Sequence, residues 1–121
     1  MPFRRSKYKI RRTVNKRILQ RVVNRIVEVA DPDKIILFGS AARGEMNGNS
    51  DLDLLVVKSG IHRRRLTQAI YRNMLGVGVS TDIIVVTPED IEQYSEAIGL
   101  ILEPALREGR IVYEHKTIPT R

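Results

Sequence analysis

The chain has 121 residues, no cysteine and a formal net charge of +7. A chain of this length forms one domain with a single modest core, and the lack of cysteine excludes disulfides and thiolate metal sites. No run of about 18 apolar residues is present, so we expect no membrane-spanning helix. The basic N-terminal residues are not followed by an apolar stretch, so we expect no secretory signal and a cytoplasmic location.

The positive charge is concentrated in one segment. Residues 1–27 contain ten Lys and Arg and no acid, which leaves 11 of the 21 bases against all 14 acids in the remainder. Such a segment can bind nucleic acid or an acidic partner through counterion release, or it can be a solvated arm and helix face. Because residues 1–12 offer only Phe3 and Tyr8 for stacking, we favour a protein partner or solvation over nucleic acid.

The first half of the chain predicts a helix, a strand and a short helical turn. Residues 1–12 read as a loosely attached basic arm. An apolar stripe with helical period predicts a helix over residues 13–30, which Pro32 ends because proline disfavours a helical residue before it. The wholly apolar residues 35–38 predict a short strand buried on both faces. Residues 41–43 predict a single helical turn.

The second half continues the alternation of strands and helices. Residues 45–50 predict a polar turn, 52–57 a strand, 61–75 a helix and 82–86 a further strand. Thr87 and Pro88, followed by acids, predict a helix start. Residues 98–108 predict a helix that Pro104 kinks or restarts, and residues 111–113 a short edge strand. The pattern predicts an α/β or α+β domain over residues 13–115 with three or four strands, followed by a tail at 116–121.

Two like charges, Asp51 and Asp53, stand at the head of an otherwise apolar strand. Side chains at positions i and i+2 of a strand share a face, so the two carboxylates lie side by side and repel each other. A bound divalent cation would neutralise this repulsion, since magnesium is bound by one or two carboxylates plus substrate phosphates. The alternative is a solvent-facing strand end with two acids of no special role.

Gly39 and Ser40 close the preceding buried strand. A glycine lets the backbone approach a ligand closely, and the peptide N–H groups that begin the next turn favour phosphate. The serine hydroxyl adds a further phosphate partner. By itself this pair is only a turn, but a short loop joins it to the two acids. We therefore expect a phosphate cradle beside a metal-binding strand face.

A third carboxylate is expected, because two metal ions need more than two ligands and the nucleophile needs activation. Asp82 opens an apolar strand and its neighbours are small or apolar, so it is not one acid in an acidic run. A neighbouring strand could carry it beside Asp51 and Asp53. The other acids fall in helices or turns.

Gly39-Ser40, ten residues, and then Asp51-Leu52-Asp53 resembles the motif of the DNA polymerase β-like nucleotidyltransferase superfamily. The fuller form here is GSAARG, residues 39–44, with Ser50 before the acid pair. The chain is similar to the minimal (MNT-type) nucleotidyltransferases, which are often encoded beside a HEPN-domain protein as antitoxin and toxin. The similarity runs from about Asp31 to Tyr113.

The resemblance implies a small mixed sheet flanked by helices, two Mg²⁺ ions (or Mn²⁺) and ATP as the donor. It makes three carboxylates both catalytic residues and metal ligands: Asp51, Asp53 and Asp82. Asp82 would bind the catalytic metal and help to deprotonate the acceptor. The same resemblance assigns nucleotide contacts to Gly39, Ser40, Arg43 and Ser50.

The function implied is transfer of AMP to a hydroxyl acceptor. About 120 residues leave no room for the helical domain with which larger relatives hold the acceptor, so a partner protein is expected to bring it. The resemblance suggests a HEPN-type ribonuclease toxin that is silenced by AMP, often at a tyrosine. Two alternatives stay open: a non-catalytic module that neutralises its partner by covering it, and a nucleotidyltransferase that binds nucleic acid through its basic arm. No membrane partner is expected.

Overall fold

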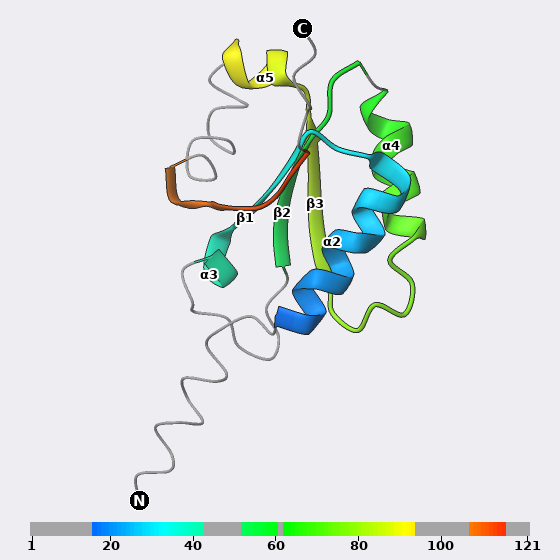
Figure 1. Ribbon diagram of the computed structural model, residues 1–121. Helices are drawn as coiled ribbons and strands as arrows, with labels where there is room; N and C mark the ends of the chain where they lie inside the picture. The colour runs from blue at the N-terminus through cyan, green and yellow to red at the C-terminus, as the bar shows by residue number, and fades with distance from the viewer. Residues whose placement is uncertain (1–15, 43–51, 61, 94–106, 116–121) are drawn as a thin grey trace, which may run out of the picture.

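A computed structural model describes residues 16–42, 52–60, 62–93 and 107–115. One four-stranded sheet has the strand order β3-β2-β1-β4, and α2 and α4 lie together on one of its faces (Figure 1). The domain is therefore α+β with a small mixed sheet, as predicted. In chain order the elements are α2 (Lys16–Ala30), β1 (Lys34–Phe38), α3 (Gly39–Ala42), β2 (Leu52–Val57), α4 (Arg63–Arg72), β3 (Thr81–Val86), α5 (Pro88–Glu92) and β4 (Arg110–Glu114).

The sheet combines antiparallel and parallel pairing. β1 runs antiparallel to both β2 and β4, whereas β2 and β3 are parallel. Parallel neighbours need a crossover connection, and α4 supplies it between β2 and β3. The end of β1 therefore meets the starts of both β2 and β3 at one edge of the sheet, where Asp53 pairs with Phe38 on one side and Asp82 on the other.

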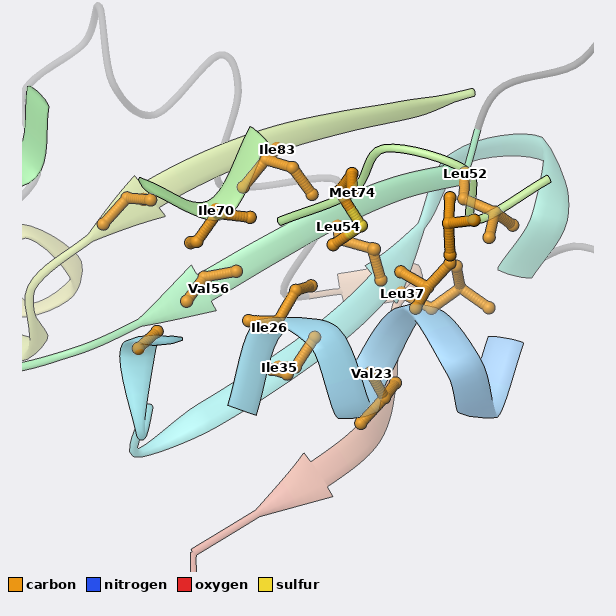
Figure 2. Close-up of a cluster of buried hydrophobic side chains, with 14 of the residues drawn as sticks. Val23, Ile26, Ile35, Leu37, Leu52, Leu54, Val56, Ile70, Met74 and Ile83 are labelled. Atoms are coloured by element: carbon orange, nitrogen blue, oxygen red, sulfur yellow. The ribbon is translucent and has the colours of Figure 1, made fainter. Parts of the chain in front are cut away.

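The main core lies between the sheet and the two long helices. Alternate residues of the central strands, among them Leu37 and Leu54, meet Val22 and Ile26 of α2 and Ile70 of α4, and all five are fully buried. Figure 2 shows Ile26, Leu37 and Leu54 among the side chains that fill the space between α2 and the strands. Burial of this apolar surface is the main favourable contribution to folding.

A second, smaller apolar cluster covers the opposite face. It joins Ile36, Leu55, Val57 and Val86, and Ile91 of α5 packs against it. The strand predicted over residues 35–38 is thus buried on both faces, as expected. The odd-numbered residues of β2 point to this second face, and Asp53 stands at its open end.

Helix lengths agree with the predictions except at a few ends. α2 is confirmed over its described part and stops at Ala30, where Asp31 adopts a left-handed conformation with φ 43°. α3 begins at Gly39, two residues earlier than predicted. The predicted helix at 98–108 lies mostly outside the described residues, as do residues 1–12, 45–50 and 116–121.

α4 is shorter than the predicted 61–75. Its first turn is capped by His62, whose Nδ1 accepts a hydrogen bond from the Arg65 N–H at 3.4 Å. It ends at Arg72, because the side chain of the next residue, Asn73, turns toward α2. The Asn73 Nδ2 group donates to the Arg25 carbonyl (2.8 Å) and to Glu28 Oε1 (3.0 Å). This cross-helix bond fixes the turn in a way that helical periodicity cannot reveal.

Two bases of the N-terminal segment hold this turn. Arg25 Nη1 donates to the Asn73 and Leu75 carbonyls at 2.9 and 3.0 Å, and Arg21 Nη1 donates to the Val77 carbonyl at 3.2 Å. They satisfy carbonyl groups just beyond a helix end, where no intrahelical partner is available. Part of the basic segment is thus structural rather than merely solvated.

α5 begins as the sequence predicted. Thr87 and Asp90 form a reciprocal capping box, in which the Thr87 hydroxyl accepts from the Asp90 N–H at 3.0 Å and the Thr87 N–H donates to Asp90 Oδ2 at 2.9 Å. Arg63 forms an ion pair with the same carboxylate at 3.0 Å, which links the start of α4 to α5. None of the helices in the described part of the chain is long and apolar enough to cross a membrane.

Leu54→Ala is expected to lower the free energy of unfolding by about 2–5 kcal/mol, because it leaves a cavity between β2 and the helix layer. Ile111, 55 % exposed on β4, supplies the control, and Ile111→Ala should cost less than about 0.5 kcal/mol. Urea unfolding followed by circular dichroism measures both. Equal losses would contradict the placement of the core.

Candidate active site

Three segments distant in sequence converge at one edge of the sheet. β1 ends there and passes into α3, while β2 and β3 both start there. α3 lies at this end of the molecule, beside the starts of the strands (Figure 1). The edge brings together three of the predicted site residues: Gly39, Asp53 and Asp82.

Asp53 and Asp82 face each other across the parallel pair β2–β3. They are direct register partners, and partners on neighbouring strands lie about 4.8 Å apart and point to the same side of the sheet. Asp53 is half-buried and Asp82 is exposed. The structure therefore places two predicted carboxylates side by side on the face opposite α2 and α4, as expected from their positions at the heads of two strands.

Gly39 lies directly against the Asp53 carboxylate. Its φ of 75° falls in the left-handed region, and a Cβ at this position would collide with Asp53 Oδ2 and come within 3.1 Å of its Cγ. Only glycine has both the backbone freedom and the missing side chain that this arrangement requires. The close approach at Gly39 brings the start of α3 onto the Asp53 carboxylate, and the expected approach of this backbone to a ligand phosphate stays a prediction.

Several contacts that the sequence does not reveal fix the start of β3. The Tyr71 hydroxyl accepts a hydrogen bond from the N–H of Ile83 at 2.8 Å, one residue after Asp82. On the other side, the Leu52 N–H donates to the Ser80 carbonyl at 2.9 Å. These contacts hold Asp82 level with Asp53. Sequence reasoning missed Tyr71, because its role depends on how α4 packs against β3.

Three of the four remaining predicted site residues lie outside the described part of the chain. Asp51, Arg43 and Ser50 fall between β2 and α3 in residues that the structure does not describe. The backbone of Ser40 belongs to α3, but its side chain is not described. Among described residues, no group of three or more His, Asp or Glu could hold a metal ion, so the carboxylates brought together here are two of the predicted three.

The donor set fits a hard divalent cation. Magnesium prefers oxygen ligands and takes one or two carboxylates, with substrate phosphates completing its shell. Asp53 and Asp82 supply two carboxylates on one face, and the missing side chain at Gly39 lets the backbone at the start of α3 lie directly against the Asp53 carboxylate. Asp51 lies outside the described residues, and its place on this face stays a prediction from strand alternation.

A cavity of about 390 Å³ lies elsewhere on the same face. Lys34 and Val57, which are register partners, contribute to its wall, and they lie at the opposite end of the β1–β2 pair from Phe38 and Asp53. The cavity is therefore separate from the acidic edge.

Comparisons with known proteins also connect the chain with nucleotidyltransferases. The family described as "Polymerase beta, Nucleotidyltransferase" matches residues 20–118. No match was found among the curated proteins. Among solved structures, a protein from Sulfolobus solfataricus assigned as a nucleotidyltransferase is similar, with a TM-score of 0.56 and 17% identity over 81% of this chain and 78% of that one.

Two further similar structures are toxin–antitoxin complexes. One contains AMP-PNP and matches with a TM-score of 0.54 and 18% identity over 78% of this chain and 73% of that chain. The other is a mutant of the MntA–HpeT complex, with a TM-score of 0.54 and 15% identity over 85% and 76% of the two chains. At such identities the likeness establishes a shared fold.

Gly39→Ala is expected to destabilise the domain more than the matched change Gly60→Ala. Gly60 also has a positive φ (65°) but no atom within 4 Å of an added Cβ, so it should show only the backbone cost of about 1–2 kcal/mol. Gly39→Ala adds the collision with Asp53, and Asp53→Ala in the same chain should recover the excess. Urea unfolding of the three variants tests this, and equal costs at the two glycines would contradict the contact.

Proposed function

Because the chain belongs to the polymerase β nucleotidyltransferase family, we propose that it transfers AMP from ATP to a hydroxyl group of a partner protein. The observation that carries the proposal is the register pairing of Asp53 with Asp82, with Gly39 packed against the Asp53 carboxylate. This arrangement supplies what nucleotidyl transfer needs: acidic ligands for divalent cations beside a backbone segment that can approach a triphosphate.

The acids are assigned distinct tasks. Asp51, Asp53 and Asp82 would hold two Mg²⁺ ions, which when bound neutralise the triphosphate and lower the pKa of the attacking oxygen. Asp82 heads the edge strand β3 and is exposed, so it can reach an acceptor that arrives from outside the domain. In this assignment its carboxylate takes the proton of the acceptor hydroxyl.

The reaction is an in-line displacement. The acceptor oxygen forms a bond to the α-phosphorus of ATP, and the bond from that phosphorus to the bridging oxygen breaks, so pyrophosphate leaves. Gly39 and Ser40 would contact the triphosphate through the backbone at the start of α3. Arg43 and Ser50 are assigned further nucleotide contacts by the family resemblance.

The proposed acceptor is a HEPN-type toxin, with this chain as its antitoxin. Support comes from the toxin–antitoxin complexes of similar fold, one of which contains an ATP analogue, and from the resemblance to minimal nucleotidyltransferases. The exposed position of Asp82 is consistent with a large acceptor. Neutralisation by covering the toxin without transfer is the competing function, and the next experiment separates the two.

Asp82→Asn and Asp53→Asn are each expected to lower AMP transfer by about 100-fold or more, because each removes a metal-binding charge. Asp82→Asn should leave ATP binding largely intact. Glu89→Gln, an exposed acid in the first turn of α5, is the control and should transfer normally. The readout is incorporation of labelled AMP from α-labelled ATP into the co-purified toxin. Full neutralisation of the toxin by both variants would favour the covering mechanism instead.

ATP binding is expected to depend on a divalent cation. Phosphate oxygens complete the octahedral shell of magnesium, so titration with ATP in the presence of Mg²⁺ should give at least about tenfold tighter binding than titration in EDTA. Isothermal calorimetry measures both affinities, and Asp53→Asn should remove most of the difference. Equal affinities with and without the cation would contradict the metal-dependent assignment.

A further inference from the structure

The two helices that cover one face of the sheet are strongly basic. α2 and α4 carry eight Lys and Arg and a single acid, Glu28, whereas the other described residues hold four bases against nine acids. The positive charge of the described residues is thus concentrated on the helix layer, where Arg63 is paired with Asp90 of α5 at 3.0 Å, and the acidic remainder includes Asp53 and Asp82. The eight bases are Lys16, Arg17, Arg21, Arg25, Arg63, Arg64, Arg65 and Arg72.

These charges lie on the surface of a rigid layer. All of them are exposed except Arg25, which is half-buried. On α4, Arg65 and Arg72 are seven positions apart and so share one side of the helix. Hydrogen bonds between Asn73 and Arg25 join α2 to the end of α4. The bases of α2 and the bases of α4 therefore keep a fixed spacing. A preorganised cationic surface loses little conformational entropy when it binds.

The sequence before α2 adds to this charge. Six further bases precede Lys16 without an acid: Arg4, Arg5, Lys7, Lys9, Arg11 and Arg12. Within the described residues, the packing of α2 beside α4 brings the bases of α2 next to the four arginines of α4, which are separate in sequence (Figure 1).

We propose that the outer surface of α2 and α4 binds the phosphate backbone of double-stranded RNA. Interfaces with nucleic acid are much more positively charged than those between proteins, whereas the cores of protein interfaces are depleted in charge. This layer has many charges and few large exposed apolar side chains, which are Val29 on α2 and Tyr71 on α4. Charge complementarity therefore favours a polyanion as the occupant of α2 and α4, whereas the scarcity of aromatic residues in 1–12 favoured a protein partner or solvation for the basic segment.

The form of the layer selects a duplex. Single-strand binders stack bases on aromatic side chains, but Tyr71, the one aromatic residue within described α2 and α4, is 39 % exposed and its hydroxyl is bonded to the Ile83 N–H. Reading DNA requires a helix that enters the major groove, whereas both helices here lie flat on the sheet (Figure 1). Double-stranded RNA is recognised mostly by shape and by its backbone.

The test is fluorescence anisotropy with a labelled RNA duplex of about 20 base pairs, the full chain and no nucleotide, at several salt concentrations. Binding should weaken steeply with salt. A plot of the logarithm of the binding constant against the logarithm of the salt concentration should have a slope of about −0.9 for each phosphate neutralised. Arg64→Glu with Arg65→Glu should weaken binding at least tenfold and make the slope shallower by about 2. Arg64→Lys with Arg65→Lys keeps the charge and should bind nearly as the natural chain does.

A matched control carries the same change of charge elsewhere. Arg107→Glu with Arg110→Glu also lowers the net charge from +7 to +3, but both residues lie outside the helix layer. This control should weaken binding by less than about threefold, because its charges do not contact phosphate. Thermal unfolding of both double variants verifies that they fold.

Four results would overturn the proposal. They are no binding at about 0.1 M salt, equal losses in the two double variants, equal or tighter binding to the DNA duplex of the same sequence, and displacement of the RNA by polyglutamate at equal charge concentration. The last would identify the layer as a surface for an acidic protein. Asp53→Asn with Asp82→Asn should bind RNA normally, so the outcome is independent of the proposed transfer reaction.

Discussion

The whole arrangement depends on the alternation of side chains along β2. Leu52, Leu54 and Val56 must face α2 and α4, because they fill the main core and are fully buried. Side chains of a strand alternate between faces, so Asp53 is forced to the opposite side. A slip of one residue would place a carboxylate in the core and a leucine at the acidic edge. The same apolar contacts that stabilise the domain therefore orient its candidate catalytic acid.

The second acid depends on the crossover through α4. Because β2 and β3 are parallel, their starts meet at one edge, and the register aligns Asp82 with Asp53. The bond from the Ile83 N–H to the Tyr71 hydroxyl anchors this strand to α4. The segment that connects α4 to β3 is held by the hydrogen bond from the Arg21 guanidinium to the Val77 carbonyl. The packing of the helix layer thus helps to fix the positions of the acids on the other face of the sheet.

The sheet also divides the charge of the molecule. Like charges gathered on one surface repel each other, which lowers the stability of the folded state but raises the affinity for a polyanion. Here the bases gather on α2 and α4, and the acids of β2 and β3 face away from them. A phosphate backbone attracted to the helix layer is therefore kept from the acidic face. The two faces can act independently.

The sequence by itself determined most of the secondary structure and the identity of the acidic residues. Hydrophobic periodicity located α2 and the strands, and Thr87 with Pro88 located α5, because these signals are local. The end of α4 at Arg72 and the role of Tyr71 came only from the tertiary structure, since both depend on hydrogen bonds between distant segments. The same is true of the register that pairs Asp53 with Asp82 and of the packing that brings the bases of α2 next to those of α4. Such contacts are decided by which elements pack together, and no local pattern encodes that choice.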